Sequence, residues 1–281
     1  MLGTSACSFA PDHVRPPLPV AASFPDGAQP GDSIARIGWR DFFRDPELQR
    51  LIAAALADNR DIRIAATRVA EARAAWRIDG AALYPQLDAV ATGTRGRTLY
   101  SLPVTGATPV DVKQVSAQLS ASWTIDFWGR LRNLRDAARA QYLATEEARR
   151  GVATEIVAQV ASGYLLEREY EERIDLARHS IETREETLRI LRRRYEVGSG
   201  SKLDMTQAQL LLAQANRTLQ ALEQERGVNR NALSLLVGSP VEVAPGHLSL
   251  TQVPENLVLP AGLPSDLLTN RPDIVAAEHQ L

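Results

Sequence analysis

Residues 130–196 read RLRNLRDAARAQYLATEEARRGVATEIVAQVASGYLLEREYEERIDLARHSIETREETLRILRRRYE, and the stretch VGSGS follows at 197–201. Residues 130–196 contain no proline, and small or apolar residues recur mostly at steps of three and four, which predicts one continuous helix with a heptad seam. At ~1.5 Å per residue, about 65 residues extend about 100 Å, several times the diameter of a small domain. The seam comprises Ala153, Ile156, Val160, Gly163, Tyr170, Ile174, Ala177, Ile181, Leu188, Leu191 and Tyr195.

The composition lies within the globular range, with 281 residues of which 44% are hydrophobic and 23% charged. A net charge of -2 argues against a nucleic-acid partner. No run of 18 apolar residues occurs, so the sequence predicts no transmembrane helix, and a membrane role would have to use strands.

The single cysteine, Cys7, follows the small residues of MLGTSA. Residues 1–7 resemble the end of a bacterial lipoprotein signal, in which the cysteine carries the lipid. Ser8 follows in place of the aspartate that holds such lipoproteins in the inner membrane, which favours the outer membrane. The alternative is a reduced thiol in a tail. Residues 8–38 carry six prolines and are interpreted as an extended tether.

A first helix is predicted at residues 47–83, with Asp45 as N-cap and Pro46 at the first helical position. Its seam steps by four and three from Leu48 to Leu83, and Pro85 ends it. Such a regular seam predicts packing against at least one partner helix.

Between residues 86 and 127 the period changes from about 3.5 to 2, which predicts two strands at 87–97 and 113–127. The second alternates strictly and ends in aromatic residues, as in a transmembrane barrel strand with an interfacial girdle. The alternative is the hairpin of a soluble sheet. Two strands make no stable sheet alone, so either interpretation needs further strands. The predicted outward, membrane-facing residues are Val115, Ala117, Leu119, Ala121, Trp123, Ile125 and Phe127.

A last long helix is predicted at residues 203–237, after a turn at 197–202. Together with the helix at 47–83 it contains about 72 residues, roughly 108 Å of helix, so the two could stack end to end along the long helix. Residues 241–264 are interpreted as a proline-rich connector. Residues 267–277 then echo residues 56–66 at a constant offset, which indicates that a second repeat begins within 265–281. The chain is therefore interpreted as a fragment covering roughly the first repeat.

Several motifs coincide in order along the chain. They are Trp39-x-x-Phe42-Phe43-x-Asp45-x-x-Leu48, Leu56-x-x-Asn59-x-Asp61-Ile62, Tyr84-Pro85, the run SWTIDFWGRL at 122–131, Tyr195-x-x-Gly198-Ser199-x-Ser201-x-Leu203-Asp204, the run LLVG at 235–238 and the run NRPD at 270–273. In this combination and order they resemble the outer-membrane factor family of efflux proteins, the TolC-like and NodT-type channels.

The resemblance implies a mainly α protein with a β-hairpin: long coiled-coil helices of a periplasmic tunnel, and two transmembrane strands per repeat of a barrel formed by a homotrimer. It also implies an outer-membrane location and contact with outer-membrane lipid. The partners would be a periplasmic membrane-fusion adaptor and, through it, an inner-membrane pump. By position, Val197, Gly198, Ser199 and Leu203 are candidates for the adaptor-docking tip, and Asp204 for the entrance gate.

No catalytic chemistry is expected. The four histidines are far apart without metal-ligand spacing, so neither a metal site nor a cofactor is predicted. A passive conduit for drugs or other small molecules needs no catalytic site. The competing hypothesis is a periplasmic coiled-coil scaffold or adaptor-like interaction protein without a pore.

Overall fold

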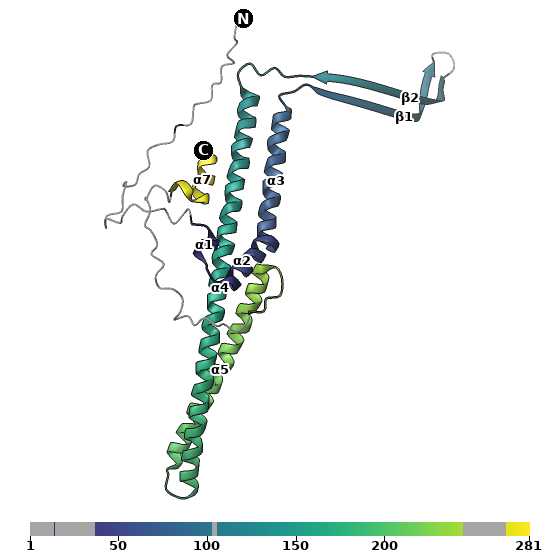
Figure 1. The fold of residues 1–281 in the computed structure, drawn as a ribbon. Coiled ribbons are helices and arrows are strands. Elements are labelled where there is room, and N and C mark those ends of the chain that lie inside the picture. The colour runs from purple at the N-terminus through teal and green to yellow at the C-terminus, as the bar shows by residue number, and fades with distance from the viewer. Residues whose placement is uncertain (1–13, 15–36, 103–105, 244–267) are drawn as a thin grey trace. The chain divides into compact units, whose positions relative to one another are not determined.

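The computed structural model describes residue 14 and residues 37–102, 106–243 and 268–281 (Figure 1). It confirms a mainly helical fold with one antiparallel hairpin. The elements are α1 (Trp39–Phe42), α2 (Pro46–Asp58), α3 (Arg60–Ala81), β1 (Gln86–Leu102), β2 (Gly106–Ser122), α4 (Arg130–Glu196), α5 (Lys202–Val237) and α7 (Pro272–His279). Cys7, most of the tether and most of the connector lie outside the described residues.

The chain forms two compact units. The hairpin unit contains residues 70–143, which are the end of α3, both strands and the beginning of α4. The helical unit contains residues 17–69 and 144–281. Both α3 and α4 continue without interruption from one unit into the other, and α4 covers the same residues, 130–196, as the predicted long helix.

Helix α2 begins as its sequence predicts. The Oδ1 atom of Asp45 accepts hydrogen bonds from the backbone N–H groups of Glu47, at 2.8 Å, and Leu48, at 3.3 Å. Pro46 occupies the first turn, where a missing N–H costs nothing. The cap fixes where α2 starts and therefore which of its residues face the core.

The prediction of one helix over 47–83 was wrong, because the structure breaks it at Asn59. This residue has a non-helical ψ of 134°, and its Oδ1 atom accepts hydrogen bonds from the N–H groups of Asp61 and Ile62 at 2.8 and 3.1 Å. Asparagine favours this capping role, whereas the heptad spacing continues through it unchanged. Helix α2 therefore ends at Asp58 and α3 begins at Arg60, with only Asn59 between them.

The same side chain joins α2 to the end of α5. The Nδ2 atom of Asn59 donates to the carbonyl of Leu236 at 2.8 Å. Next to it, Gly238 ends α5 with a φ of 83°, and a Cβ atom there would lie 3.0 Å from the carbonyl oxygen of Asp58. Only glycine suits both the left-handed conformation and this close approach. Within the helical unit, α2 and α5 thus meet end to end.

The core of the helical unit lies where α2 crosses the middle of α4. Leu51, Ile52 and Val160 are fully buried there. The remaining members of this cluster are Leu48, Ala55, Ile156, Ala161, Tyr164, Val237, Val241 and Val243. Large apolar side chains from α2 fill the space beside small and branched residues of α4, which is how two helices with regular seams exclude water.

The two strands pair in one register from Gln86 opposite Ser122 to Leu102 opposite Gly106. Both extend further toward the turn than the predicted ranges 87–97 and 113–127. At the other end β2 stops at Ser122, so the prediction that Trp123, Ile125 and Phe127 are strand residues was wrong. Residues 123–126 have no strand assignment, because β1 begins only at Gln86 and offers them no backbone partner.

Helix α7 begins at Pro272, with Arg271 in the N-cap position. Pro272 lies near Gly151 of α4: a Cβ atom built on Gly151 would be 3.8 Å from the Cβ atom of Pro272. In the sequence echo Asn270 corresponds to Asn59, yet α7 starts two residues after Asn270 while α3 starts one residue after Asn59. The proline in the second copy, absent from the first, accounts for this shift because it favours the first helical turn.

Among the described residues, none of the helices combines the length and the apolar character that crossing a bilayer would require.

Candidate functional site

The turn between α4 and α5 closes α4 with a Schellman motif. The N–H of Ser199 donates to the carbonyl of Arg194 at 2.9 Å, and the N–H of Gly198 donates to the carbonyl of Tyr195 at 3.0 Å. Gly198 has a φ of 76°, the left-handed conformation that this motif requires. The turn is therefore a defined structure in which the backbone of α4 is satisfied.

The predicted tip residues lie together in this turn. Ser201 caps α5, since its Oγ atom accepts a hydrogen bond from the N–H of Leu203 at 3.0 Å. Val197 is 60% exposed and Leu203 is 63% exposed. A rigid turn with two exposed apolar side chains is suited to contact with another protein. We call Val197, Gly198, Ser199 and Leu203 the tip.

Asp204 lies in the first turn of α5 and is exposed. It forms no ion pair within the part of the chain that the structure describes. Its carboxylate interacts favourably with the positive end of the helix dipole, which is sufficient to account for an acidic residue at this position. A role in closing an entrance stays a prediction.

The two faces of the hairpin differ in character between Leu87 and Thr94 of β1. Val115 and Leu119, predicted to face outward, are exposed. The strand register places a small or apolar residue of β1 opposite each predicted outward residue within β2. Val115 pairs with Gly93, Ala117 with Ala91, Leu119 with Ala89 and Ala121 with Leu87. Because paired residues point to the same face, these eight residues form one uncharged surface, which we call the apolar face.

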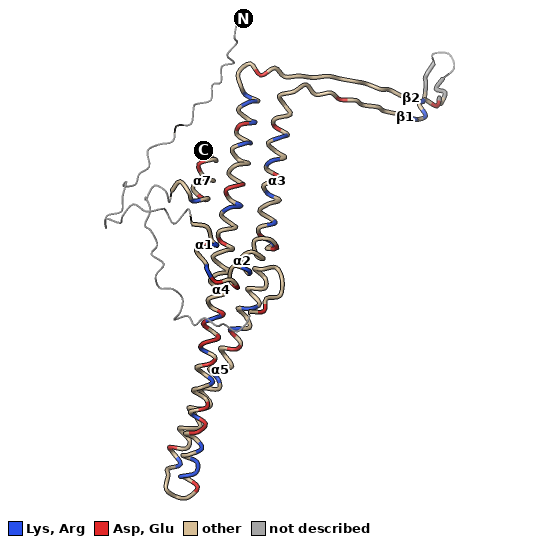
Figure 2. The backbone as a smooth tube through the Cα atoms, viewed as in Figure 1, with Lys and Arg blue, Asp and Glu red and all other residues tan. Residues whose placement is uncertain are grey.

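The other face of the hairpin is mostly polar, although Val90 and Val112 also lie on it. Thr92 pairs with Ser116, and their hydroxyl oxygens lie 2.6 Å apart. Charges gather near the end away from the helices, where Arg97 forms an ion pair of 3.0 Å with Asp111 (Figure 2). The rest of the described hairpin is nearly free of charge, so the charged group marks one limit of the apolar face.

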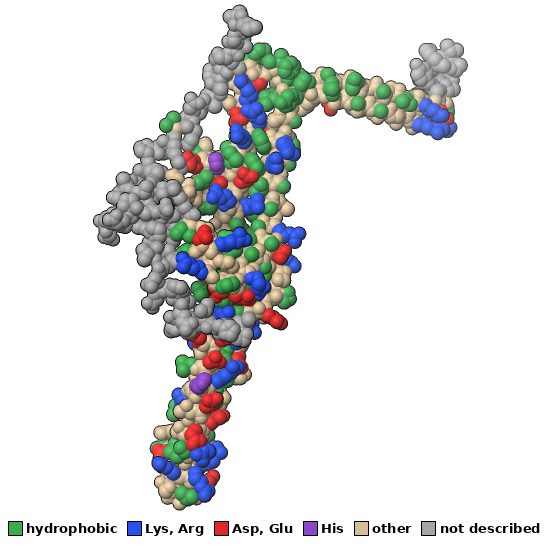
Figure 3. Space-filling model, in the orientation of Figure 1, with side chains coloured by type: hydrophobic (Ala, Val, Ile, Leu, Met, Phe, Trp, Pro, Cys, Tyr) green, Lys and Arg blue, Asp and Glu red, His purple; other side chains and the backbone are tan. Residues whose placement is uncertain are grey.

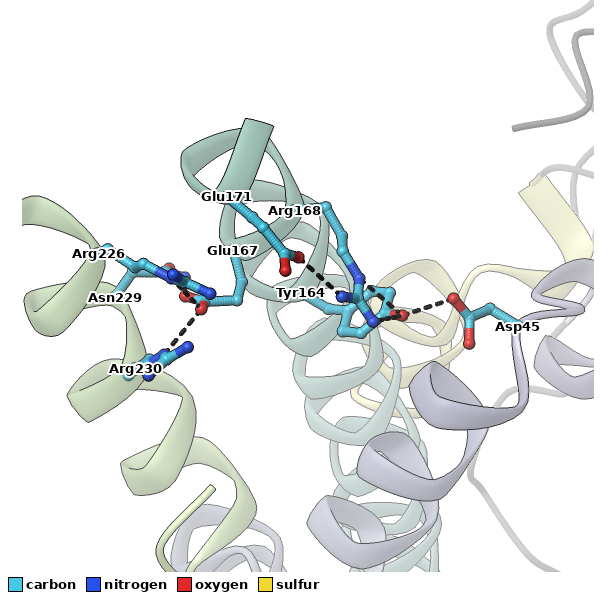
Figure 4. Close-up of polar contacts among 8 residues, drawn as sticks. All are labelled: Asp45, Tyr164, Glu167, Arg168, Glu171, Arg226, Asn229 and Arg230. Carbon is cyan, nitrogen blue, oxygen red and sulfur yellow. Dashed lines mark hydrogen bonds and ion pairs between the residues drawn. The ribbon is translucent and has the colours of Figure 1, made fainter. Parts of the chain in front are cut away.

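A polar network within the helical unit connects α2 to α4 (Figure 4). The hydroxyl of Tyr164 donates to Oδ2 of Asp45 at 2.6 Å. Arg168 donates to the same hydroxyl oxygen at 2.9 Å and to Glu171 at 3.0 Å. The carboxylate that caps α2 is thus also tied to α4, which fixes the position of α2 along the long helix.

A second network on the same turns of α4 connects it to α5 (Figure 4). The side chain of Glu167 is fully buried, and its Oε1 atom accepts hydrogen bonds from Arg226 at 2.6 Å and from Arg230 at 2.7 Å. Asn229 donates to the carbonyl of Gly163 at 3.0 Å. A Cβ atom on Gly163 would lie 2.7 Å from Leu233, so α4 and α5 approach closely beside this buried charge.

Tyr164 makes the stability of this region sensitive to alkaline pH. Burial, and then the hydrogen bond to the Asp45 carboxylate, raise the pKa of Tyr164 to about 12 from its ordinary value of 10.0. A raised folded-state pKa means that the stabilisation is complete below pH ~10 and is lost as the pH rises from about 10 to about 12.

We therefore expect the wild-type protein to lose about 2–3 kcal/mol of stability between pH 10 and pH 12 through this one hydroxyl. Tyr164→Phe should cost about 1–3 kcal/mol at pH 7, because it removes a hydrogen bond to a charged group, but should show a weaker alkaline loss. Thermal midpoints followed by circular dichroism from pH 8 to 12 measure both effects. Parallel pH curves for the two proteins would contradict this assignment.

The described residues contain no group of three or more His, Cys, Asp or Glu side chains arranged to hold a metal ion.

Comparison with known proteins identifies the family. The model of the outer membrane efflux protein family matches residues 51–239, about two thirds of the chain. The chain belongs to this family. The match begins within α2 and runs through the hairpin and α4 to the end of α5, so it includes the tip, the apolar face and the network around Glu167, whereas Asp45 of the first network precedes it.

Individual family members are similar over the whole chain. The solvent efflux pump outer membrane protein SrpC of Pseudomonas putida is 39% identical, with 100% of this chain and 61% of SrpC aligned. The cation efflux system protein CusC of Escherichia coli is 35% identical, with 100% of this chain and 60% of CusC aligned. The open-state MtrE outer membrane channel of Neisseria gonorrhoeae is 32% identical with a TM-score of 0.79, over 98% of this chain and 61% of MtrE. The chain spans about three fifths of the length of these family members.

Sequence reasoning missed the two polar networks, although a signal for the second was present. The seam of α4 skips from Gly163 to Tyr170, and Glu167 fills the vacant position at the same spacing. In α5 the apolar residues Leu219 and Leu222 are followed at the same spacing by Arg226 and Asn229, before the apolar pattern resumes at Leu233. Polar residues that interrupt the apolar seams of both α4 and α5 indicate that these residues pair with each other.

Proposed function

We propose that this chain is part of the outer-membrane channel of a tripartite efflux system, a passive conduit for drugs or other small molecules. Membership of the outer membrane efflux protein family and the similarity to MtrE support this proposal. The observation that carries it is the hairpin, whose apolar face is exposed in the chain and whose opposite face is polar.

The apolar face covers a large part of the thickness of a bilayer. On β1 it extends from Leu87 to Gly93, which is six positions further on. At ~3.4 Å per residue this distance is about 20 Å, and a strand tilted by about 40° spans about 16 Å of membrane. The hydrophobic band of outer-membrane barrels is about 25 Å tall. We propose that the apolar face contacts outer-membrane lipid and that the polar face lines a wet lumen.

Two strands alone do not form a stable sheet, and every backbone group in lipid must be paired. We therefore propose that three copies of the protein form a closed barrel together, with α3, α4 and α5 contributing to a periplasmic tunnel. We also propose that Cys7 carries a lipid anchor to the same membrane. A passive conduit of this kind needs no catalytic residue.

Arginine on the apolar face tests the membrane role. We expect Leu119→Arg to lose about 2–4 kcal/mol of insertion free energy if position 119 lies near mid-bilayer, and hence to fail to reach the outer membrane. Gln118→Arg is the matched control, because the neighbouring position lies on the polar face. Outer-membrane fractions, and ion conductance of the purified protein in planar bilayers, measure the effect. Equal membrane levels of both variants would favour the scaffold without a pore.

We propose that the tip docks a periplasmic membrane-fusion adaptor, through which the channel couples to an inner-membrane pump, and that Asp204 helps to close the entrance. Val197→Asp should weaken docking at least ten-fold, because it places a charge in the centre of an exposed apolar contact. Ser199→Asp, in the same turn, controls for the added charge. Cross-linking to the adaptor and the drug tolerance of cells measure docking, and normal coupling in Val197→Asp would contradict the proposal.

A further inference from the structure

The hairpin unit contains a hollow of ≈ 380 Å³ where α3 ends and α4 begins. Small residues, Gly80 and Ala81, leave the space open, and Trp76 and Tyr84 form its aromatic walls. Its volume lies within the range of small-molecule sites, about 300–1,000 Å³. Neither the conduit nor the tip requires a hollow at this place.

Two guanidinium groups line the hollow, those of Arg77 and Arg135. Arg135 already donates from Nε and Nη2 to Oδ1 of Asp136, at 3.0 and 2.7 Å. Arg77 is exposed and forms no ion pair within the described ranges of the chain. The hollow therefore has one free cation and one partly compensated cation, and it favours an anion of one negative charge.

One aromatic wall of the hollow, Trp76, is held in place. The ring of Trp76 stacks on that of Tyr142, with centroids 5.7 Å apart and an interplanar angle of 10°. The indole N–H of Trp123 donates to the carbonyl of Leu83 at 3.1 Å, which ties the residue after β2 to the turn after α3. A preformed wall of this kind loses little conformational entropy when a ligand binds.

The hollow lies directly beside the predicted membrane boundary. Only a short turn separates it from β1, and the exposed indole rings of Trp123 and Trp128 follow β2. Figure 3 shows hydrophobic side chains gathered where the helices of this unit meet the hairpin, with basic side chains further along the helices. Tryptophan and tyrosine concentrate at the level of lipid headgroups, and basic pockets at that level bind anionic headgroups.

We propose that this hollow binds the phosphate headgroup of a membrane phospholipid. Arg77 donates to the phosphate oxygens with help from the free Nη1 of Arg135, and Trp76 and Tyr84 contact the glycerol and the first methylene groups. The site orients the hairpin unit against the inner surface of the membrane. This inference rests on the proposed function only in placing the hairpin in a bilayer.

The test titrates the detergent-solubilised full-length protein with dihexanoyl phosphatidylglycerol and follows tryptophan fluorescence. Trp76→Phe identifies the part of the signal that comes from the hollow. We expect a saturable change in the wild-type protein, at least ten-fold weaker binding in Arg77→Gln, and unchanged binding in Arg73→Gln. The control removes the same charge from an exposed position one turn earlier on α3, outside the hollow. Gly80→Leu, which fills the space, should also abolish the response.

Dihexanoylglycerol, which lacks the phosphate, and inorganic phosphate, which lacks the lipid, should both fail to reproduce this binding. The proposal is overturned if neither arginine variant differs from wild type, if both weaken binding equally, or if inorganic phosphate alone binds as tightly. It is also overturned if the wild-type protein shows no response; a change of oligomeric mass in Arg77→Gln would then show that a second copy covers the hollow.

Conductance is measured on the same samples. Protein that conducts without responding to the lipid contradicts only the headgroup site, whereas protein that binds the lipid without conducting contradicts the proposed conduit.

Discussion

Glu167→Ala is expected to lower the free energy of unfolding by about 3–5 kcal/mol, because it removes one partner of a buried charge network. The Glu167 carboxylate is fully buried between α4 and α5, and one of its oxygens accepts hydrogen bonds from Arg226 and Arg230. Without it two guanidinium groups face each other beside an apolar contact. Arg230, whose side chain is 39% exposed, can turn to solvent, while Arg226, at 22%, is more confined.

The matched control for this change is Glu169→Ala on the same helix. Glu169 also pairs with an arginine, Arg173, at 2.9 Å, but both side chains are about half exposed. Exposed pairs of this kind contribute about 0.3–0.5 kcal/mol, so the control should be nearly neutral. Thermal and denaturant midpoints of the protein in detergent measure both variants. Equal midpoints for the two would show that the buried network contributes no more than a surface pair.

Replacing the whole network tests a further consequence of its burial. A triple variant with Met at positions 167, 226 and 230 should recover much of the stability lost in Glu167→Ala, because apolar residues of similar volume remove the desolvation penalty. Such a result would show that the charges fix the alignment of α4 and α5 more than they stabilise it.

Asn59→Leu is expected to cost about 2–4 kcal/mol. The change removes the N-cap of α3, which contributes about 0.5–2 kcal/mol, and leaves the partly buried carbonyl of Leu236 without its donor, at about 1–3 kcal/mol. Asn59 is 2% exposed, so water cannot easily replace either hydrogen bond. Limited proteolysis should also show earlier cleavage near the α2–α3 break, because that joint loses the link to α5.

Two further variants separate the roles of Asn59. Asn59→Asp keeps the capping oxygen but not the donor to Leu236, so it should retain the N-cap while losing the link to α5. Asn216→Leu is the control, since Asn216 donates to the carbonyl of Leu212 at 3.1 Å on an exposed face of α5. That change should be nearly neutral. If Asn216→Leu lowered the stability as much as Asn59→Leu does, the stabilising role assigned to the link between α2 and α5 would be contradicted.

The long helix and the hairpin were predictable because each depends on a local period. Helix α4 covers the predicted residues, and the turn after it follows from a single glycine in a left-handed conformation. Strand bounds were less accurate. Alternation continued past Ser122 to Phe127, but a strand also needs a partner with free backbone groups, and β1 supplied none beyond Gln86.

The break at Asn59 shows why a regular seam did not suffice. Asparagine at a seam position is compatible both with a continuous helix and with a cap, and the spacing around it is the same in either case. What decides is the carbonyl of Leu236, which is 177 residues away in the sequence and becomes available only when α5 ends beside α2. The interruption of the apolar seam of α4 at Glu167 was likewise visible in the sequence, but the two arginines that pair with Glu167 were not.

The sequence by itself determined the local elements: the helical and strand periods, the caps at Asp45 and Ser201, and the glycine turn, since each depends on residues within a few positions of one another. Only the tertiary structure decided the division of the first helix, the pairing of Glu167 with two arginines of α5, and the hollow beside Trp76. These features join segments far apart in the chain. Their energies come from burial and hydrogen bonding, which exist only after the helices have packed.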